Sequence, residues 1–426
     1  MLPTICFTSD ALNTFLDDLD LALTKPQRRH LEEVSEGLLM TDGRKTLTAV
    51  TRQLVEQRDI YAVADFFRQS PWPVDALRTP LQEHLLAAAR TQVATLPAAQ
   101  RVVVLSLDDS TCHKPRSSQH FEPVDWHGDY TEHTAGVGPQ GKRYAYGLPV
   151  LTCRVSVGDQ AYTADWRLYL RARTVRRLNR HRSRRRRLHF RSKLALAREM
   201  LAELAPHLPQ DCRIHVVFDS WYASAKLIRF CLRQGWQVIC DLKANRTLDG
   251  RSLRTHAQTL RHQRYDHTIV RATDGAQTTY YTRTLQGQVK RLAAPVTVLQ
   301  SRRHPRDHHP KYLLCTDRTL APQEILTLYA QRWGCEVDYL YLKTRLGLED
   351  FRLRSVEGIA KYIAVVFLVL AFLQMQQRRG RHRTLSEALA AHRQQQLRTL
   401  VTEVIHYALQ HGSPEPVFRR FLRAAA

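Results

Sequence analysis

Four polar residues in the last third of the chain have types and spacing that could build a reactive site. They are Tyr329, Arg332, Glu336 and Lys343. The segment from Pro322 to Leu346 has no internal proline and no glycine before Gly334, so we expect one long helix there. At about 100° per residue, the four side chains fall within roughly 60° of one another around its axis. A carboxylate between an arginine and a lysine on such a stripe suits a place where a metal ion meets a nucleic-acid phosphate.

An apolar sector lies beside this stripe on the same predicted helix. Its members are Leu326, Trp333, Val337 and Leu340. Their spacing predicts that the helix buries them against the rest of the fold. We expect Trp221 and Tyr222 to be core residues too, and the alternative for these aromatic side chains is stacking on an unpaired base. The alternative for the charged stripe is an ordinary amphipathic helix whose charges face water.

Further acids follow two apolar runs. The run that starts at Arg101 and continues as VVVLSL ends in Asp108 and Asp109, and the run IHVVF, residues 214–218, ends in Asp219. Runs rich in β-branched residues predict buried strands, each with a carboxylate at its tip. These acids need a helix or a second strand beside them before they can act together.

The charge balance of the chain indicates a polyanionic partner. The 426 residues include 64 Lys and Arg against 40 Asp and Glu, a net charge of +24. Such a surplus favours DNA, RNA or an anionic membrane surface, and the alternative is a soluble protein that is merely basic. The hydrophobic content of 43% is ordinary for a globular protein, which excludes the disordered class.

Arginine is concentrated in residues 171–191, where eleven of the residues are Arg. No folded core could hold that density of charge, so the segment must be exposed. Arginine suits phosphate contacts, and a solvated face is the alternative. The DNA contacts that we expect from this run are Arg176, Arg177, Arg180, Arg184, Arg185 and Arg186.

Residues 1–95 have the apolar spacing of helices. Within them, residues 43–54 followed by residues 59–72 could form a helix-turn-helix motif. Its basic residues Arg44, Lys45 and Arg52 would then touch DNA. A plain helical bundle explains the same pattern equally well.

The cysteines, the N-terminal residues and one apolar run indicate the cellular compartment. Eight cysteines are scattered without a CxxC pair, which favours reduced thiols of a cytoplasmic protein over a zinc ribbon or a disulfide framework. The N-terminus lacks a signal-peptide pattern. The apolar run from Tyr362 to Met375 is too short to span a bilayer comfortably. We therefore expect a buried core helix and no membrane partner.

The helix motif Tyr329-x2-Arg332-x3-Glu336-x6-Lys343 matches a Y-(2)-R-(3)-E-(6)-K signature. On this motif, on the Asp-Asp-Ser sequence at 108–110 and on FDSWY around Asp219, the chain resembles bacterial insertion-sequence transposases with an Asp-Asp-Glu site. The resemblance covers about residues 41–375. The order of predicted elements from residue 101 resembles the ribonuclease H-like fold.

The expected fold class is therefore α/β, a ribonuclease H-like mixed sheet with helices on both faces. Helical regions at both termini and a β-rich insertion complete it. Strands are expected at 144–157 and 163–170, joined by a hairpin turn at Gly158-Asp159. The predicted parts are a helical N-terminal DNA-binding domain (1–95), a catalytic domain in two pieces (96–243 and 318–376), the β-rich insertion (244–317) and a C-terminal helical tail (377–426).

The resemblance implies that Asp108, Asp219 and Glu336 are the catalytic triad and hold two Mg²⁺ ions, or Mn²⁺ in their place. Family members follow the first acid with a nearby Thr or Ser, which favours Asp108 over Asp109. Three converging carboxylates repel one another unless cations neutralise them. The remaining signature residues, Tyr329, Arg332 and Lys343, would bind phosphates of DNA.

The implied activity is DNA transposition, in which element ends are cleaved and their 3′-hydroxyls are joined to target DNA. The implied partners are double-stranded DNA, both transposon ends and target, and a second copy in a homodimer on DNA. The implied location is the cytoplasm of a bacterium, at the nucleoid. The alternatives are a ribonuclease H-like nuclease without strand transfer and a catalytically inactive DNA-binding protein.

Overall fold

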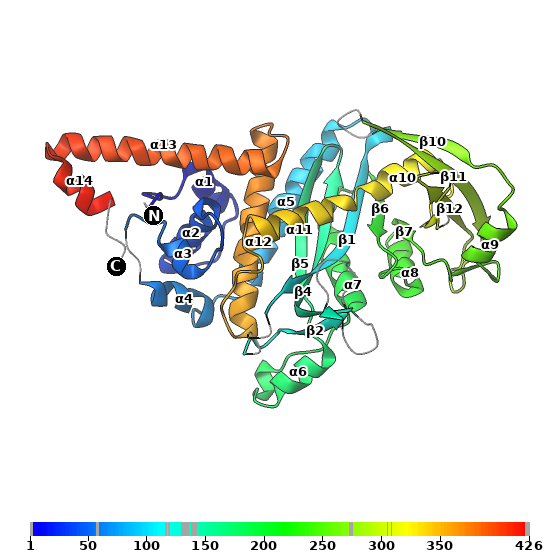
Figure 1. Cartoon of the computed structure of the whole chain (residues 1–426), viewed down its shortest axis with the longest axis horizontal. Coiled ribbons are helices and arrows are strands. Elements are labelled where there is room, and N and C mark those ends of the chain that lie inside the picture. The colour runs from blue at the N-terminus through cyan, green and yellow to red at the C-terminus, as the bar shows by residue number, and fades with distance from the viewer. Residues whose placement is uncertain are drawn as a thin grey trace.

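The structure is a computed structural model. It describes residues 3–56, 59–115, 117, 120–128, 136–137, 143–271, 276–304, 306–307 and 309–421. Figure 1 shows a long mixed sheet, with helices from both ends of the chain gathered at one side and a second group of strands at the other. The described part is thus mixed α/β, as the sequence predicts.

Five strands form the middle of the sheet in the spatial order β5-β4-β1-β6-β7. They are β1 (Val102–His113), β4 (Arg143–Val157), β5 (Gln160–Leu168), β6 (Arg213–Phe218) and β7 (Gln237–Asp241). Strands β1, β6 and β7 are parallel, whereas β4 is antiparallel to both β1 and β5. The turn between β4 and β5 lies at Gly158, whose φ of +57° suits glycine. The predicted hairpin is confirmed.

The strands that follow β7 extend the same sheet. They are β10 (Asp266–Arg271), β11 (Gln277–Gly287), β12 (Val296–Arg302) and β13 (Lys311–Cys315). Strand β13 pairs antiparallel with β7, so the predicted insertion is β-rich and joins the central sheet directly. Small elements complete the strand set: β2 (Asp125–Gly128) and β3 (Gly136–Val137) on β4, and the pair β8 (Thr247–Leu248) and β9 (Arg251–Ser252) before α9 (Leu253–Thr259).

Helices cover both faces of the central strands (Figure 1). Against one face pack α5 (Asp75–Thr95), α7 (Lys193–Leu204) and α8 (Ala225–Arg233), which bury the odd-numbered β1 residues at 103, 105 and 107. Against the other face lie α10 (Pro322–Ala330) and α11 (Trp333–Thr344). The period of two along β1 therefore decides which helices each of its side chains meets.

Helix α12 (Val356–Arg379) is the centre of the largest core. Its stretch at 362–375 is almost entirely buried, so the predicted core helix is confirmed. Within the described residues it is the one helix long and apolar enough to cross a membrane, and 89% of its most apolar window is buried inside the protein. Around it pack helices from both ends of the chain: α1 (Asp10–Asp18), α2 (Lys25–Met40), α4 (Ile60–Arg68) and α13 (Leu385–His411).

The N-terminal region forms a helical bundle rather than a helix-turn-helix. Helix α3 (Leu47–Thr51) has only five residues, and the chain leaves it to make a bridge between Ile5 and Leu54. A groove-binding helix pair needs two full helices, so the bundle interpretation matches the structure. At the other end, α14 (Pro414–Phe421) folds back on α13 through Val417 and Phe421.

The prediction of one long helix from Pro322 to Leu346 is wrong. The helix is broken between α10 and α11, and the backbone N–H groups of Arg332, Gly334 and Cys335 bond three residues back instead of four. This tighter turn rotates α11 relative to the predicted helix. As a result α11 buries Cys335, Asp338, Tyr339 and Leu342, whereas Trp333 and Leu340 are 62% and 58% exposed.

Candidate active site

The adjacent acids Asp108 and Asp109 point to opposite faces of the sheet. Asp108 shares the face of Ser106, whose carbonyl meets the Cys335 thiol of α11 at 3.6 Å. Asp109 shares the face of α7. Of these two acids only Asp108 can therefore face α11, in line with the preference for it over Asp109.

Asp108 is not at a strand tip, contrary to the prediction, because β1 continues to His113. Its parallel neighbour β6 does end at Phe218, which pairs with Leu107. Asp108 and Asp219 are the next residues of these two neighbouring strands. The register thus sets the two acids side by side where the parallel pairing stops.

Arg332 joins two of the three predicted catalytic acids. Its Nη1 donates to Asp108 Oδ2 at 2.5 Å, and its Nη2 donates to Glu336 Oε1 at 2.6 Å. The Arg332 side chain is only 15% exposed, and its Nε is buried without a hydrogen-bond partner among the described residues. The break before α11 is what brings this guanidinium over the sheet.

The acids lie in surroundings that disfavour their charge. Burial raises the pKa of Asp108 to about 7, although the Arg332 guanidinium opposes this shift. Burial also raises the pKa of Asp219, against the N–H bonds that its Oδ1 accepts from Trp221 at 2.9 Å and Tyr222 at 3.3 Å. The negative charge of Asp219 is felt at Asp108. Positive charge beyond that of Arg332 would therefore be favourable here.

The donors fit a hard divalent cation, because Asp108, Asp219 and Glu336 offer carboxylate oxygens only. Across the described ranges, no three His, Cys, Asp or Glu side chains already gather as a metal-binding group. Arg332 lies between two of the acids instead. The chemistry of the donor set fits Mg²⁺, and the present counter-ion is a guanidinium.

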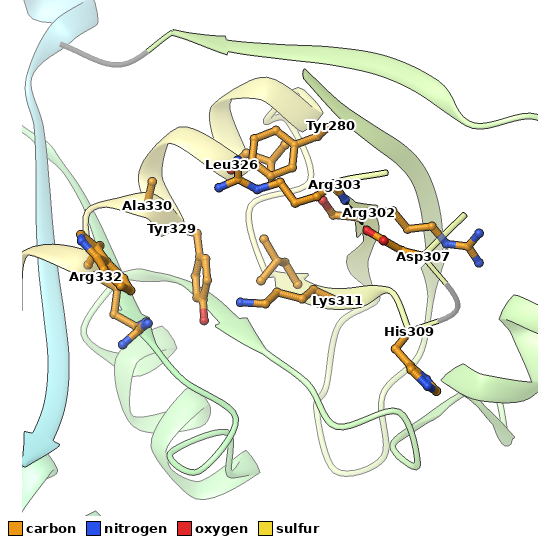
Figure 2. Close-up of a pocket in the computed structure, with 13 residues that line it drawn as sticks. Tyr280, Arg302, Arg303, Asp307, His309, Lys311, Leu326, Tyr329, Ala330 and Arg332 are labelled. Carbon is orange, nitrogen blue, oxygen red and sulfur yellow. Dashed lines mark hydrogen bonds between the residues drawn. The ribbon is translucent and has the colours of Figure 1, made fainter. Parts of the chain in front are cut away.

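A cavity of about 610 Å³ opens beside Arg332, and Tyr329 and Trp333 also line it. Figure 2 shows Tyr329 and Arg332 from the helical side and Lys311, Arg302 and Arg303 from the strands around the same cavity. The remaining signature residue, Lys343, lies two helical turns farther on. Its Nζ donates to the Thr111 carbonyl at 2.7 Å and pairs with Glu349 at 3.0 Å. Arg332 and Glu336 thus gather at Asp108, Tyr329 lines the cavity beside Arg332, and Lys343 stands apart.

Sequence reasoning missed three charged residues around these acids. Asp241 ends β7, the next parallel strand after β6. Burial raises the pKa of Tyr329, and the charge of Asp241, like that of Asp219, helps to raise it. The rule that found Asp219, an acid at the end of an apolar strand, could have found Asp241. Lys311 on β13 lowers the raised pKa of Asp241, which is chiefly a product of burial. Lys193 binds Asp109, and nothing in the sequence signals this contact.

The arginine-rich segment is exposed, as predicted. It contains α6 (Ala172–Asn179) and a short 3₁₀ turn at Arg184–Arg186, and it projects beneath β2 in Figure 1. All six of its predicted contact residues have exposed side chains. Some neighbouring arginines are used internally, since Arg173 pairs with Asp125 and Arg182 pairs with Glu122 and Glu357.

The three basic residues predicted near the N-terminus differ in their surroundings. Arg44 and Arg52 are exposed. Lys45 is 2% exposed and donates its Nζ to the Thr41 carbonyl. Burial lowers the pKa of Lys45 to about 8. The expected DNA contact of Lys45 does not fit this position, because its ammonium lies inside the fold.

The three aromatic residues near the candidate acids differ in burial. Tyr222 is buried, as expected. Trp221 and Trp333 are 48% and 62% exposed, contrary to the expectation of core packing. Both lie within a few residues of a candidate acid, so an exposed ring accompanies each of Asp219 and Glu336.

Comparison with known proteins finds one family model that matches part of the chain. Residues 191–372 match the family model of the transposase DDE domain. This range contains Asp219, Arg332 and Glu336, and it begins after Asp108. No curated protein matches the chain. The chain is similar to the piggyBac transposase in the cryo-EM structure of its synaptic complex with hairpin DNA, with a TM-score of 0.42, 11% identity and coverage of 93% of this chain and 80% of that one.

Proposed function

We propose that this chain is a metal-dependent DNA transposase that cleaves the ends of its element and joins their 3′-hydroxyls to target DNA. The observation that carries the proposal is the Arg332 bridge between Asp108 and Glu336, next to Asp219. The three acids come from two strands and a helix far apart in the sequence. The match of residues 191–372 to the transposase DDE domain supports the same conclusion.

In this proposal Asp108, Asp219 and Glu336 hold two Mg²⁺ ions. When bound, such ions activate a water or a 3′-hydroxyl and stabilise the leaving oxygen of a phosphodiester. Arg332 holds Asp108 and Glu336 close together while they are ionised. A guanidinium can also bind a phosphate in a bidentate manner. Tyr329, at the cavity, and Lys343, farther along α11, would contact the DNA backbone on either side of the cleaved bond.

The DNA surface in this proposal includes the exposed arginines of residues 171–191, together with Arg44 and Arg52. A net charge of +24 supports a large phosphate contact area. Because two element ends must be held together, the active form would be a homodimer on DNA. The proposed setting is an insertion sequence of a bacterium, with the protein in the cytoplasm at the nucleoid.

The strand order β5-β4-β1-β6-β7 supports a ribonuclease H-like catalytic core. In such a core the antiparallel strand β4 lies beside β1, and parallel strands follow on the other side. The acids then lie on the central strand, beside its parallel neighbour and on a helix across the sheet.

The test uses the full chain, Mg²⁺ or Mn²⁺, a labelled duplex containing the DNA that flanks its own coding sequence, and a supercoiled plasmid. Covalent joining of the labelled strand to the plasmid is the expected product. Cleavage without joining would favour the nuclease alternative. DNA binding with neither reaction would favour an inactive binding protein. The matched control is Asp338→Asn, because Asp338 lies on the same helix but faces the core.

A further inference from the structure

Asp109 has no role in the proposed chemistry, yet its carboxylate is firmly held. Its Oδ1 accepts from the Tyr222 hydroxyl at 2.6 Å, and its Oδ2 accepts from Lys193 Nζ at 2.5 Å. The side chains of Asp109 and Lys193 are only 15% and 16% exposed. We call this group the tether; it consists of Asp109, Tyr222 and Lys193.

Tyr222 connects the tether to the second candidate acid. Its hydroxyl binds Asp109, while its backbone N–H donates to Asp219 Oδ1 at 3.3 Å. The Tyr222 side chain is 1% exposed, so its ring cannot move without repacking the core. Lys193 adds a second link, since its Nζ lies 4.9 Å from the centre of the Trp221 ring. Trp221 is the other residue whose N–H binds Asp219.

Asp219 needs such support because it follows the last residue of β6. Beyond Phe218 no ladder hydrogen bond to β1 holds the chain among the residues described there. Asp109, in contrast, is inside β1 and is paired with Leu151 of β4. A bond from the loop to Asp109 is therefore a bond to the rigid sheet, one residue away from Asp108.

From this geometry we infer that Asp109, Tyr222 and Lys193 are positioning residues that fix Asp219 relative to Asp108. Lys193 also neutralises Asp109, which would otherwise add a fourth negative charge beside Asp108, Asp219 and Glu336. The inference rests on the proposed function, because it assigns the tether to the same divalent-ion site. Lys193 follows the arginine-rich segment directly, so one stretch of chain would contact DNA and support the acids.

The test compares Tyr222→Phe with Tyr362→Phe. Both tyrosines are almost fully buried, and each loses its hydroxyl contacts, which are with Asp109 for Tyr222 and with the carbonyls of Gly347 at 2.8 Å and Lys45 at 3.3 Å for Tyr362. The readouts are Mn²⁺ affinity by water-proton relaxation, thermal unfolding and DNA affinity. We expect Tyr222→Phe to weaken Mn²⁺ binding about tenfold or more, as loss of an outer-shell partner does. Tyr362→Phe should leave Mn²⁺ binding unchanged.

Lys193 gives a second and independent comparison. Lys193→Met should weaken Mn²⁺ binding, and Lys193→Arg should restore most of it because the cation is kept. Equal Mn²⁺ affinity in wild type, Tyr222→Phe and Lys193→Met would overturn the inference while leaving the proposed function intact. An equal loss in Tyr222→Phe and Tyr362→Phe would overturn it as well, by showing a general structural effect. A wild-type protein that binds no Mn²⁺ and cleaves no DNA would overturn both.

Discussion

Helix α11 carries two carboxylates that differ in burial and in how completely they are satisfied. Asp338 accepts from Arg154 Nε at 3.0 Å, from Thr163 Oγ1 at 2.8 Å and from Gln374 Nε2 at 3.2 Å. Glu336, two positions earlier, has its one described side-chain bond with Arg332, which it shares with Asp108. The first centre faces the core, whereas in the second Arg332, and not Glu336, lines the cavity of Figure 2.

The difference separates a structural centre from a reactive one. A buried charge that has a full set of partners locks the parts around it, whereas acids that share a single cation keep room for further ligands. Even the helix sequence is adapted to the structural centre. A Cβ at Gly334 would lie 2.4 Å from the Arg154 guanidinium, so a side chain there would have to displace the group that donates to Asp338.

The strongest test of this distinction is chemical. Glu336→Gln should reduce DNA cleavage by more than about a hundredfold, because a charged group at the reaction centre is lost. Asp338→Asn should leave the cleavage rate of the folded enzyme close to that of wild type. Rates are measured on supercoiled plasmid with Mg²⁺, at a temperature where circular dichroism shows both variants folded. Equal losses of activity would erase the distinction.

The two arginines should show the opposite order in stability. Arg154→Met leaves Asp338 buried without its cation, at a cost of about 3–5 kcal/mol in the free energy of unfolding. Arg332→Met should cost less, because the side chain of Glu336 is 39% exposed and can be solvated, and because Asp108, whose pKa burial raises to about 7, can take up a proton. Urea unfolding followed by circular dichroism measures both free energies. A larger loss for Arg332→Met would make Arg332 the structural cation.

Exposed arginines in two parts of the molecule should differ in how much they contribute to DNA binding. Replacing Arg184, Arg185 and Arg186 by Ala should reduce the slope of log K against log salt by about 2 to 3, since each phosphate contact contributes about 0.9. A matched control replaces three exposed arginines, Arg251 of β9, Arg254 of α9 and Arg264 just before β10. Filter binding across a salt series gives the slopes. An unchanged slope in the first variant would mean that the 3₁₀ turn faces solvent in the complex.

The smallest effect concerns Lys45, whose pKa burial lowers from 10.5 to about 8. Between these pH values the unfolded chain binds more protons at this residue than the folded chain, so its contribution to stability rises with pH. Below pH 8 the buried charge is a constant cost. The difference in unfolding free energy between wild type and Lys45→Met should therefore shift in favour of wild type from pH 8 to pH 10. A flat difference would contradict the buried position of this lysine.

Much of the candidate site was predictable because its residues obey local periods. Tyr329 and Arg332 still line one cavity, and Arg332 still bonds Glu336, although the helix is broken. The reason is that the break is a single tight turn. Asp219 follows its strand as expected. The extension of β1 to His113 was not predictable from the run that ends at Asp108. It depends on pairing with β4, whose partner residues lie about forty positions away.

By itself the sequence determined most strand and helix types and the exposure of the arginines, because these depend on composition or on a short repeat. The assignment of Asp108, Asp219 and Glu336 as a triad is a prediction that depends on the family resemblance. The period of two puts Asp108 and Asp109 on opposite faces, but tertiary structure alone decided which helix covers each face, that α11 turns Trp333 outward and that Lys45 is buried. These features depend on which elements pack together across hundreds of residues. No local pattern contains that information, since a side chain's neighbours are set by the fold and not by its own segment.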